Sequence, residues 1–142
     1  MRRLARASLL AALVGCHHAS APDDDLPRTL ALVDQRYSVQ PAVWVPMTAR
    51  VGVPIGVDVA IVVGEACDRF VDADVSVTGL VATVTPYVVP NASVCERSGP
   101  FDVRRFPVRF DQAGDAVVRV RVRTADQGGA EVVLERAMTV TR

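Results

Sequence analysis

The stretch Ala116-Val-Val-Arg-Val-Arg-Val-Arg123 carries the most regular pattern in the chain. Valine and arginine alternate along it, which places the two residue types on opposite faces of an extended strand. The basic face holds three side chains: Arg119, Arg121 and Arg123. This period of two predicts a β-strand with one apolar face and one polar face.

Similar runs lie on both sides of this stretch and are separated by turn residues such as Gly, Pro and Asn. Hydrophobic residues make up 50% of the chain but aromatic ones only 5%, so valine supplies most of the apolar surface, as is typical of strands. We expect about seven strands and an all-β fold in which two antiparallel sheets pack as a sandwich. The expected strands cover residues 37–45, 53–63, 70–78, 80–89, 103–110, 116–123 and 130–141.

Two of these runs resemble parts of immunoglobulin-like domains. Phe110–Val120 (FDQAGDAVVRV) resembles the turn between their fifth and sixth strands, and Val53–Ile61 (VPIGVDVAI) resembles their second strand. The resemblance covers most of residues 30–142 and implies an immunoglobulin-like antiparallel β-sandwich. The chain departs from antibody domains, because Ala116 stands where a tyrosine is common, the sixth strand lacks a cysteine, and Trp44 comes too early for their core tryptophan. The resemblance therefore implies a general bacterial immunoglobulin-like fold.

The start of the chain has the three parts of a secretory signal: a basic segment, a short apolar run and small residues before a cysteine. The apolar run, Ser8–Val14, is about half the ~20 residues that span a bilayer. Its end, Leu13-Val14-Gly15-Cys16, resembles the lipobox of bacterial lipoproteins. That resemblance implies transfer of diacylglycerol to the Cys16 thiol and cleavage after Gly15. The alternative is an ordinary cleaved signal followed by a coincidental cysteine.

These features divide the chain into a signal peptide (1–15), a lipidated cysteine with a flexible linker (16–29) and one β-domain (30–142). Two or more acyl chains hold a protein stably on a membrane, so membrane lipid is the first expected partner. By analogy with other lipoproteins, His17 after the cysteine favours the outer membrane, on its periplasmic or surface face. The histidines and aspartates of the linker indicate a solvated tether.

The charge of the chain argues against a nucleic-acid partner. The formal net charge is zero, with 16 basic residues against 16 acidic ones. Removing the three leader arginines leaves 16 − 3 = 13 basic residues, so the mature chain is mildly acidic. A protein that binds nucleic acid through its overall charge has the opposite balance.

Two cysteines, Cys67 and Cys95, remain once Cys16 is assigned to lipid. An even number in an oxidising compartment predicts a disulfide, which would contribute about 3 kcal/mol by closing the intervening loop. Two buried thiols and a metal site are the alternatives. A zinc site is disfavoured, because the histidines His17 and His18 lie in the linker.

The sequence contains no recognisable catalytic constellation and points to no cofactor or metal. It lacks a Ser-His-Asp set, a glycine-rich phosphate loop, HExxH and CxxC. Asp68, Asp72 and Asp74 lie close enough to supply calcium oxygens, but calcium takes about six to eight. Alternation with apolar residues also fits the wet face of a strand. We therefore expect a protein that is not an enzyme.

A basic sheet face is the remaining candidate site. If the strand at 103–110 pairs with the one at 116–123 as a hairpin, five arginines share one face and could bind an anion. They are Arg105, Arg109, Arg119, Arg121 and Arg123. The alternative is that the last strand places Glu131 and Glu135 across from the arginines. The overall expectation is a membrane-anchored domain making structural or adhesive contacts with an envelope protein or the cell wall, or an accessory subunit of a larger envelope complex.

Overall fold

The fold is known from a computed structural model, which describes residues 27–35, 41–62, 68–89 and 101–142. In these ranges the chain forms ten strands and one short 3-10 helix at Ala125–Gln127. The strands are β1 (Thr29–Leu30), β2 (Leu32–Val33), β3 (Val43–Trp44), β4 (Thr48–Arg50), β5 (Ile55–Val62), β6 (Arg69–Thr78), β7 (Val81–Val89), β8 (Phe101–Val108), β9 (Gly114–Thr124) and β10 (Ala130–Thr141).

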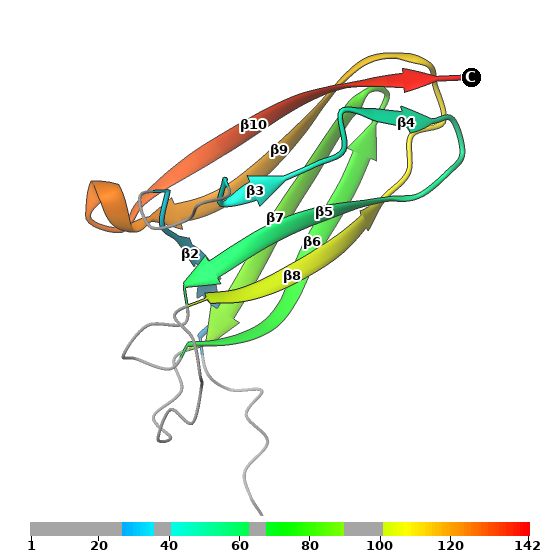
Figure 1. Cartoon of the computed structure of the whole chain (residues 1–142). Helices are drawn as coiled ribbons and strands as arrows, with labels where there is room; N and C mark the ends of the chain where they lie inside the picture. Colours follow the sequence, from blue (N-terminus) through cyan, green and yellow to red (C-terminus); the bar gives the residue numbers. More distant parts are fainter. Residues whose placement is uncertain (1–26, 36–40, 63–67, 90–100) are drawn as a thin grey trace, which may run out of the picture.

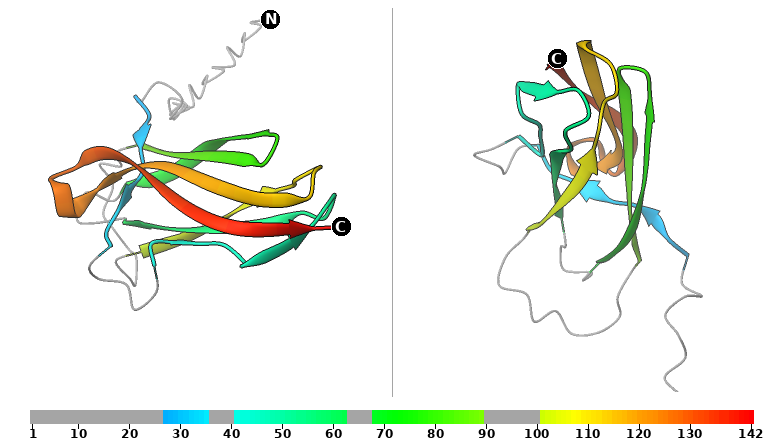
Figure 2. Two further views of the ribbon diagram at one scale, coloured as in Figure 1. Left: turned by 90° about the horizontal axis from the view of Figure 1, so that it is seen from above. Right: turned by 90° about the vertical axis from the view of Figure 1, so that its right-hand side faces the viewer.

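The strands form two sheets that pack face to face, so the predicted β-sandwich is confirmed (Figures 1 and 2). The large sheet has seven strands and follows the order β1-β7-β9-β10-β4, with β2 beside β9 and β6 beside β7. The small sheet has three strands in the order β3-β5-β8. The immunoglobulin-like identity stays a prediction.

The pairing is mixed rather than purely antiparallel. β9 and β10 form a long antiparallel hairpin, as do β6 and β7. Three other pairs are parallel: β7 with β9, β2 with β9, and β10 with β4. The parallel pairing of β7 with β9 arises because the chain leaves the large sheet after β7, forms β8 in the small sheet, and returns as β9.

The crossing between β8 and β9 overturns the expected hairpin of residues 103–110 with 116–123. β8 pairs with β5 in the small sheet, while β9 pairs within the large sheet. Phe110 lies at the crossing and is 1% exposed, and its carbonyl accepts a hydrogen bond from the Gly52 N–H at 2.8 Å. Burying this ring between the sheets turns the chain inward, so two strands close in sequence lie in different layers.

The core follows the alternation that the sequence predicts. On β9 the three valines at 118, 120 and 122 are fully buried, and on β5 the alternate residues Val57, Val59 and Ile61 are also fully buried. β-branched side chains of this kind suit a pleated surface covered on one side. Their neighbours on each strand point outward, and those outward residues decide what the two outer faces can do.

Two core-facing arginines lie near the sides of the sandwich. At one side, Arg136 on β10 donates a 3.1 Å hydrogen bond to the Val43 carbonyl on β3, which joins the two sheets. At the other side, the Arg104 guanidinium of β8 lies 5.0 Å from the Phe70 ring centre of β6 and pairs with Asp102 at 2.6 Å. Arg104 therefore covers the core with its charge already neutralised.

The three cysteines lie outside the described residues, so the lipid anchor and the Cys67–Cys95 disulfide stay predictions. The strand ends flanking the two disulfide candidates meet, however. Val62 pairs with Phe101, and Arg69 pairs with Val89. Both cysteine-bearing segments therefore start and finish at the same end of the sandwich. No helix in the described part of the chain is long and apolar enough to cross a membrane.

Candidate functional site

The structure divides the five arginines of the predicted anion-binding face between two sheets. Arg105 lies on β8 and Arg109 just after it, on the small sheet. The other three, at 119, 121 and 123, lie on β9 of the large sheet. A single basic face built on a β8–β9 hairpin does not form, because these strands do not pair.

Each arginine on β9 has a partner. Register places Arg119 opposite Glu135, and their atoms Nε and Oε1 are 2.8 Å apart. Arg121 donates to Glu131 at 2.5 Å, and Arg123 donates to the Leu30 carbonyl at 2.9 Å. The last strand therefore places Glu131 and Glu135 across from the arginines, as the alternative predicted, and two of the three arginines form ion pairs with them.

Carboxylates also line the opposite margin of this surface, on β6. Asp72 accepts a 2.6 Å hydrogen bond from Arg28, and Asp74 accepts a 3.0 Å bond from the Tyr87 hydroxyl. The hydrogen bond to Asp74 raises the pKa of Tyr87 above its usual value of 10.0, because it stabilises the protonated phenol. These carboxylates thus serve side-chain partners, and no group of three or more metal-ligating side chains occurs among the described residues.

We call this outer surface of the large sheet the polar face. The hydrogen-bonded charges described above are four arginines and four carboxylates, so they contribute no excess of either charge. They are Arg28, Arg119, Arg121, Arg123, Asp72, Asp74, Glu131 and Glu135. An anion approaching the arginines would meet flanking carboxylates at about the same distance, which removes most of the attraction.

The outer surface of the small sheet, the small face, is built differently. One row crosses its three strands in register: Trp44 on β3, Asp58 on β5 and Arg105 on β8. Arg105 donates two hydrogen bonds to the Asp58 carboxylate, of 2.7 Å from Nε and 2.8 Å from Nη2. Chiefly because of this hydrogen bond, the pKa of Asp58 is lowered from its usual 3.8.

A glycine makes room for this ion pair. A Cβ at Gly56 would come within 2.8 Å of Arg105 Cδ, so the arginine stem lies flat across the bare backbone of β5. Planar guanidinium and carboxylate groups fit this two-bond arrangement well. Both oxygens of the Asp58 carboxylate thus accept from Arg105, whose side chain is 70% exposed.

Apolar side chains surround the ion pair. Trp44 is 49% exposed and Val103 63% exposed, and register places Ala60 beside Val103 and Pro107 beside Gly56. Tryptophan and arginine are both enriched on protein-binding surfaces, and in this row Asp58 lies between the two. The small face thus combines exposed apolar side chains with a single ion pair.

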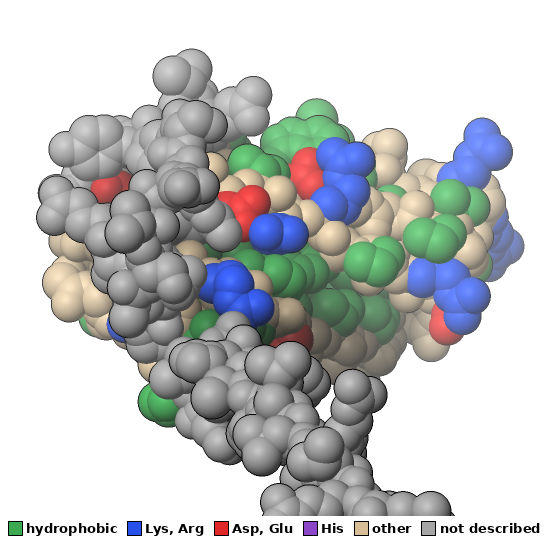
Figure 3. Space-filling view, turned by 90° about the horizontal axis from the view of Figure 1, so that it is seen from below, with side chains coloured by type: hydrophobic (Ala, Val, Ile, Leu, Met, Phe, Trp, Pro, Cys, Tyr) green, Lys and Arg blue, Asp and Glu red, His purple; other side chains and the backbone are tan. Residues whose placement is uncertain are grey.

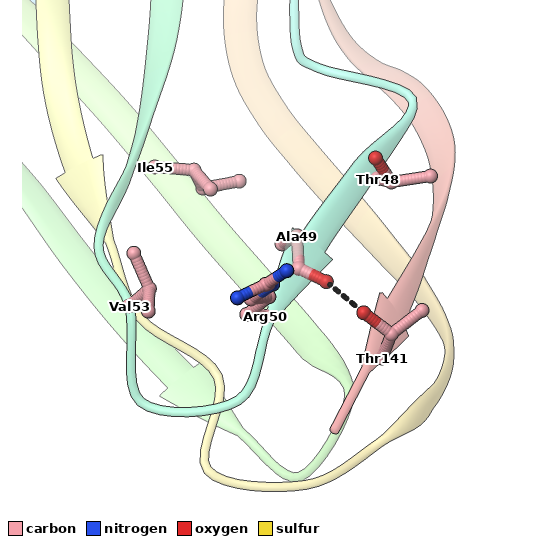
Figure 4. A pocket seen from close by; sticks show the side chains of 6 residues that line it. All are labelled: Thr48, Ala49, Arg50, Val53, Ile55 and Thr141. Atoms are coloured by element: carbon pink, nitrogen blue, oxygen red, sulfur yellow. Dashed lines mark hydrogen bonds between the residues drawn. The ribbon is translucent and has the colours of Figure 1, made fainter.

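A pocket of about 460 Å³ opens at one end of the sandwich, between β4 and β5 (Figure 4). The pocket is lined by Thr48, Ala49, Arg50, Val53, Ile55 and Thr141. The Thr141 hydroxyl is occupied by a 3.1 Å bond to the Ala49 carbonyl, so Arg50 supplies the main polar function. None of the lining residues offers a nucleophile paired with a base, and the pocket does not suggest catalysis.

Comparison with protein families, with curated proteins and with solved structures finds no match for the chain. The assignment of a functional surface therefore depends on the two faces themselves. The small face has no signature in the sequence, because its residues come from three separate strands. The proximity of Asp58 and Arg105 can be recognised only from the register between β5 and β8.

Proposed function

We propose that the chain is a membrane-anchored lipoprotein whose β-sandwich binds another envelope protein through the small face, without enzymatic activity. The lipobox-like Leu13-Val14-Gly15-Cys16 supports the anchor. The row of Trp44, Asp58 and Arg105 supports the contact, and it is the observation on which the proposed site depends.

The energetics favour the small face over the polar face. Burying Trp44 and Val103 would remove apolar surface from water, which contributes a favourable free energy of about 25 cal/mol per Å². Asp58 and Arg105 already share two hydrogen bonds, so a partner would have to desolvate one ion pair and supply acceptors for the remaining N–H groups of Arg105. On the polar face a partner would have to desolvate several ion pairs that gain little in return.

An accessory subunit of a larger envelope complex is the second form of this proposal. In that case the small face would be buried permanently instead of making reversible structural or adhesive contacts. Obligate interfaces are more hydrophobic than transient ones, and the valine, alanine and proline near the Asp58–Arg105 pair fit either form.

The anchor is tested by the intact mass of the protein taken from the membrane fraction, with and without reductant and alkylation. We expect a mass that begins at Cys16 and includes acyl chains. Two thiols, those of Cys67 and Cys95, should react only after reduction. A soluble chain without lipid would overturn the anchor, and free thiols before reduction would overturn the disulfide.

The contact face is tested by a photo-crosslinking amino acid placed at single positions in the full chain in cells. Trp44 and Val133 make a matched pair, because both side chains are 49% exposed but lie on opposite outer faces. We expect position 44 to give a discrete protein adduct and position 133 to give none. Adducts at position 133 alone would reject the small face as the binding surface.

A further inference from the structure

The strand β6 ends the large sheet on one side. Among the described strands it pairs with β7 only, so one edge of its backbone has no strand partner (Figure 1). Unpaired strand edges tend to bind a further strand unless charged residues, prolines or bulges protect them. β6 has one irregularity near its start, between Phe70 and Asp72, and contains no proline. Its charged residues all precede Val75, so the part of the strand from Val75 to Thr78 carries none of these protective features.

Hydrogen bonds on the far side of β7 show which groups of β6 point outward. The carbonyls of Pro86 and Leu80 accept from Ala31 and Val117, so these alternate residues of β7 face away from β6. The residues between them, including Thr83 and Thr85, must pair with β6, through its Ser76 and Asp74. The backbone groups of the intervening β6 residues therefore point to the open edge: Ala73, Val75 and Val77.

The side chains at this edge are apolar and half exposed. Val75 and Val77 lie opposite the buried Val84 and Ala82 and thus face the core side of the sheet, but they remain 40% and 39% exposed. The small sheet stops at β8 and leaves them uncovered. Figure 3 shows this side of the molecule, with hydrophobic side chains lying in the hollow between the two layers.

The neighbouring edge strand, β8, is protected at the equivalent place. The Ala60 N–H donates to the Ala42 carbonyl at 2.9 Å, so on β5 the groups of Ala60 and Gly56 face β3. Pro107, opposite Gly56, accordingly has its ring nitrogen on the free edge of β8, where it offers no N–H. The contrast favours β6 over β8 as an edge able to accept a strand.

We propose that β6 pairs antiparallel with β6 of a second copy of this chain, around a two-fold axis at Val75. In this register Val75 meets Val75 of the second copy, and Ala73 meets Val77. On the polar side, Asp74 meets Ser76 and Asp72 meets Thr78. Apolar residues thus oppose apolar ones and carboxylates oppose hydroxyls, a match that the β6 sequence supplies by itself.

Registers displaced toward the start of β6 fail on charge. Centring the pairing on Asp74 would set two like carboxylates directly opposite each other, and centring it on Ala73 would oppose Asp72 to Asp74. A register centred on Ser76 avoids these contacts but leaves Ala73 opposite the turn residue Gly79. The axis at Val75 pairs the three outward-pointing residues with one another and avoids like charges.

The interface is tested by disulfide trapping of the full chain in cells, using the variants Val75→Cys, Val77→Cys and Val103→Cys. A hydrogen-bonded antiparallel pair sets the two Cα atoms at position 75 about 5.5 Å apart, within disulfide reach. Val77 of one copy lies opposite Ala73 of the other, so the two Val77 residues are separated by four residues along the strand, about 13 Å. We expect at least about tenfold more linked dimer from V75C than from V77C, from V103C on β8 or from the unmodified chain.

Co-expression of Ala73→Cys and Val77→Cys chains provides a second measurement, because the register places these residues opposite each other. A mixed disulfide between them confirms the register independently of any effect of V75C on folding. The absence of linked dimer in both experiments overturns the proposal. So does a V77C homodimer that matches V75C, or a V75C adduct with a different protein, which would assign the edge to a foreign strand.

Discussion

The polar face carries its arginines between rows of carboxylates, whereas the small face carries a single arginine–aspartate pair among apolar side chains. The first looks like a binding site in the sequence and is neutralised in the structure. The second leaves hardly any trace in the sequence and combines exposed apolar side chains with a paired charge. Charge along one strand therefore says little about function until its cross-strand partners are known.

The largest expected effect on stability comes from a substitution at the crossing between β8 and β9, where the chain passes from the small sheet to the large sheet. Phe110→Ala should lower the free energy of unfolding by about 3–5 kcal/mol, because it removes a fully buried ring where the chain crosses between sheets. Urea unfolding of this variant measures the loss. Val53→Ala, at a residue 51% exposed, is the control and should stay within about 0.5 kcal/mol. A loss below about 1 kcal/mol for Phe110→Ala would show that the ring does not stabilise the crossing.

Glycine substitutions sharpen the difference between the sheets. Gly114, at the start of β9, has a φ of +144° and lies where a Cβ would come within 2.7 Å of Leu80 Cδ1. Gly114→Ala should cost about 1–3 kcal/mol of stability. Gly56→Ala should cost less, since the long Arg105 side chain that it meets can move aside. Thermal unfolding compares the two, and equal losses would contradict this account.

A smaller effect should appear in the pH dependence of stability. The pKa of Asp58 is lowered in the folded state by its hydrogen bond to Arg105. Its contribution is therefore present above the unfolded pKa of about 3.9 and is lost as the pH falls through the lower folded value. In a plot of the free energy of unfolding against pH, the Asp58→Asn variant should lose less stability at acid pH than the unmodified chain.

The polar face responds at the opposite end of the pH range. The pKa of Tyr87 is raised by the bond to Asp74, so that contribution is present below about pH 10 and is lost as the pH rises through the folded value. Tyr87→Phe should flatten the alkaline limb and leave the acid limb unchanged. If Tyr87→Phe changed the acid limb and left the alkaline limb unchanged, the assignment of the alkaline limb to the Tyr87–Asp74 hydrogen bond would be wrong.

The smallest effect should follow removal of the β9 arginines. Replacing Arg119, Arg121 and Arg123 by Gln should change binding to soluble polyglutamate by less than about twofold, because carboxylates already flank these side chains. Titration calorimetry measures this binding. A loss of tight binding in the variant would restore the anion-binding hypothesis for this row.

The sequence was most informative where one strand is long and covered on one face. The expected runs at 53–63, 70–78 and 130–141 correspond to β5, β6 and β10 within two residues at most. Two-residue strands such as β1 and β2 contain too little pattern to be found. The run expected at 37–45 corresponds, in its described part, only to β3 at Val43–Trp44.

The sheet partners were harder to predict than the strands. Alternation fixes which side of a strand is buried, but the same alternation fits pairing with a sequence neighbour or with a strand from another part of the chain. The short connection after Val108 favoured a hairpin, and only the burial of Phe110 reveals the crossing. The predicted arginine face failed for that reason, and the small face could not be assembled without the β5–β8 register.

The parallel pairing of β10 with β4 has a consequence for how the chain folds. Thr139–Thr141 align with Thr48–Arg50, so the large sheet joins segments made early and late in synthesis. Contacts between residues so distant in sequence slow folding, because the intervening chain must be closed into a loop first. The large sheet therefore stays incomplete until these two distant segments meet.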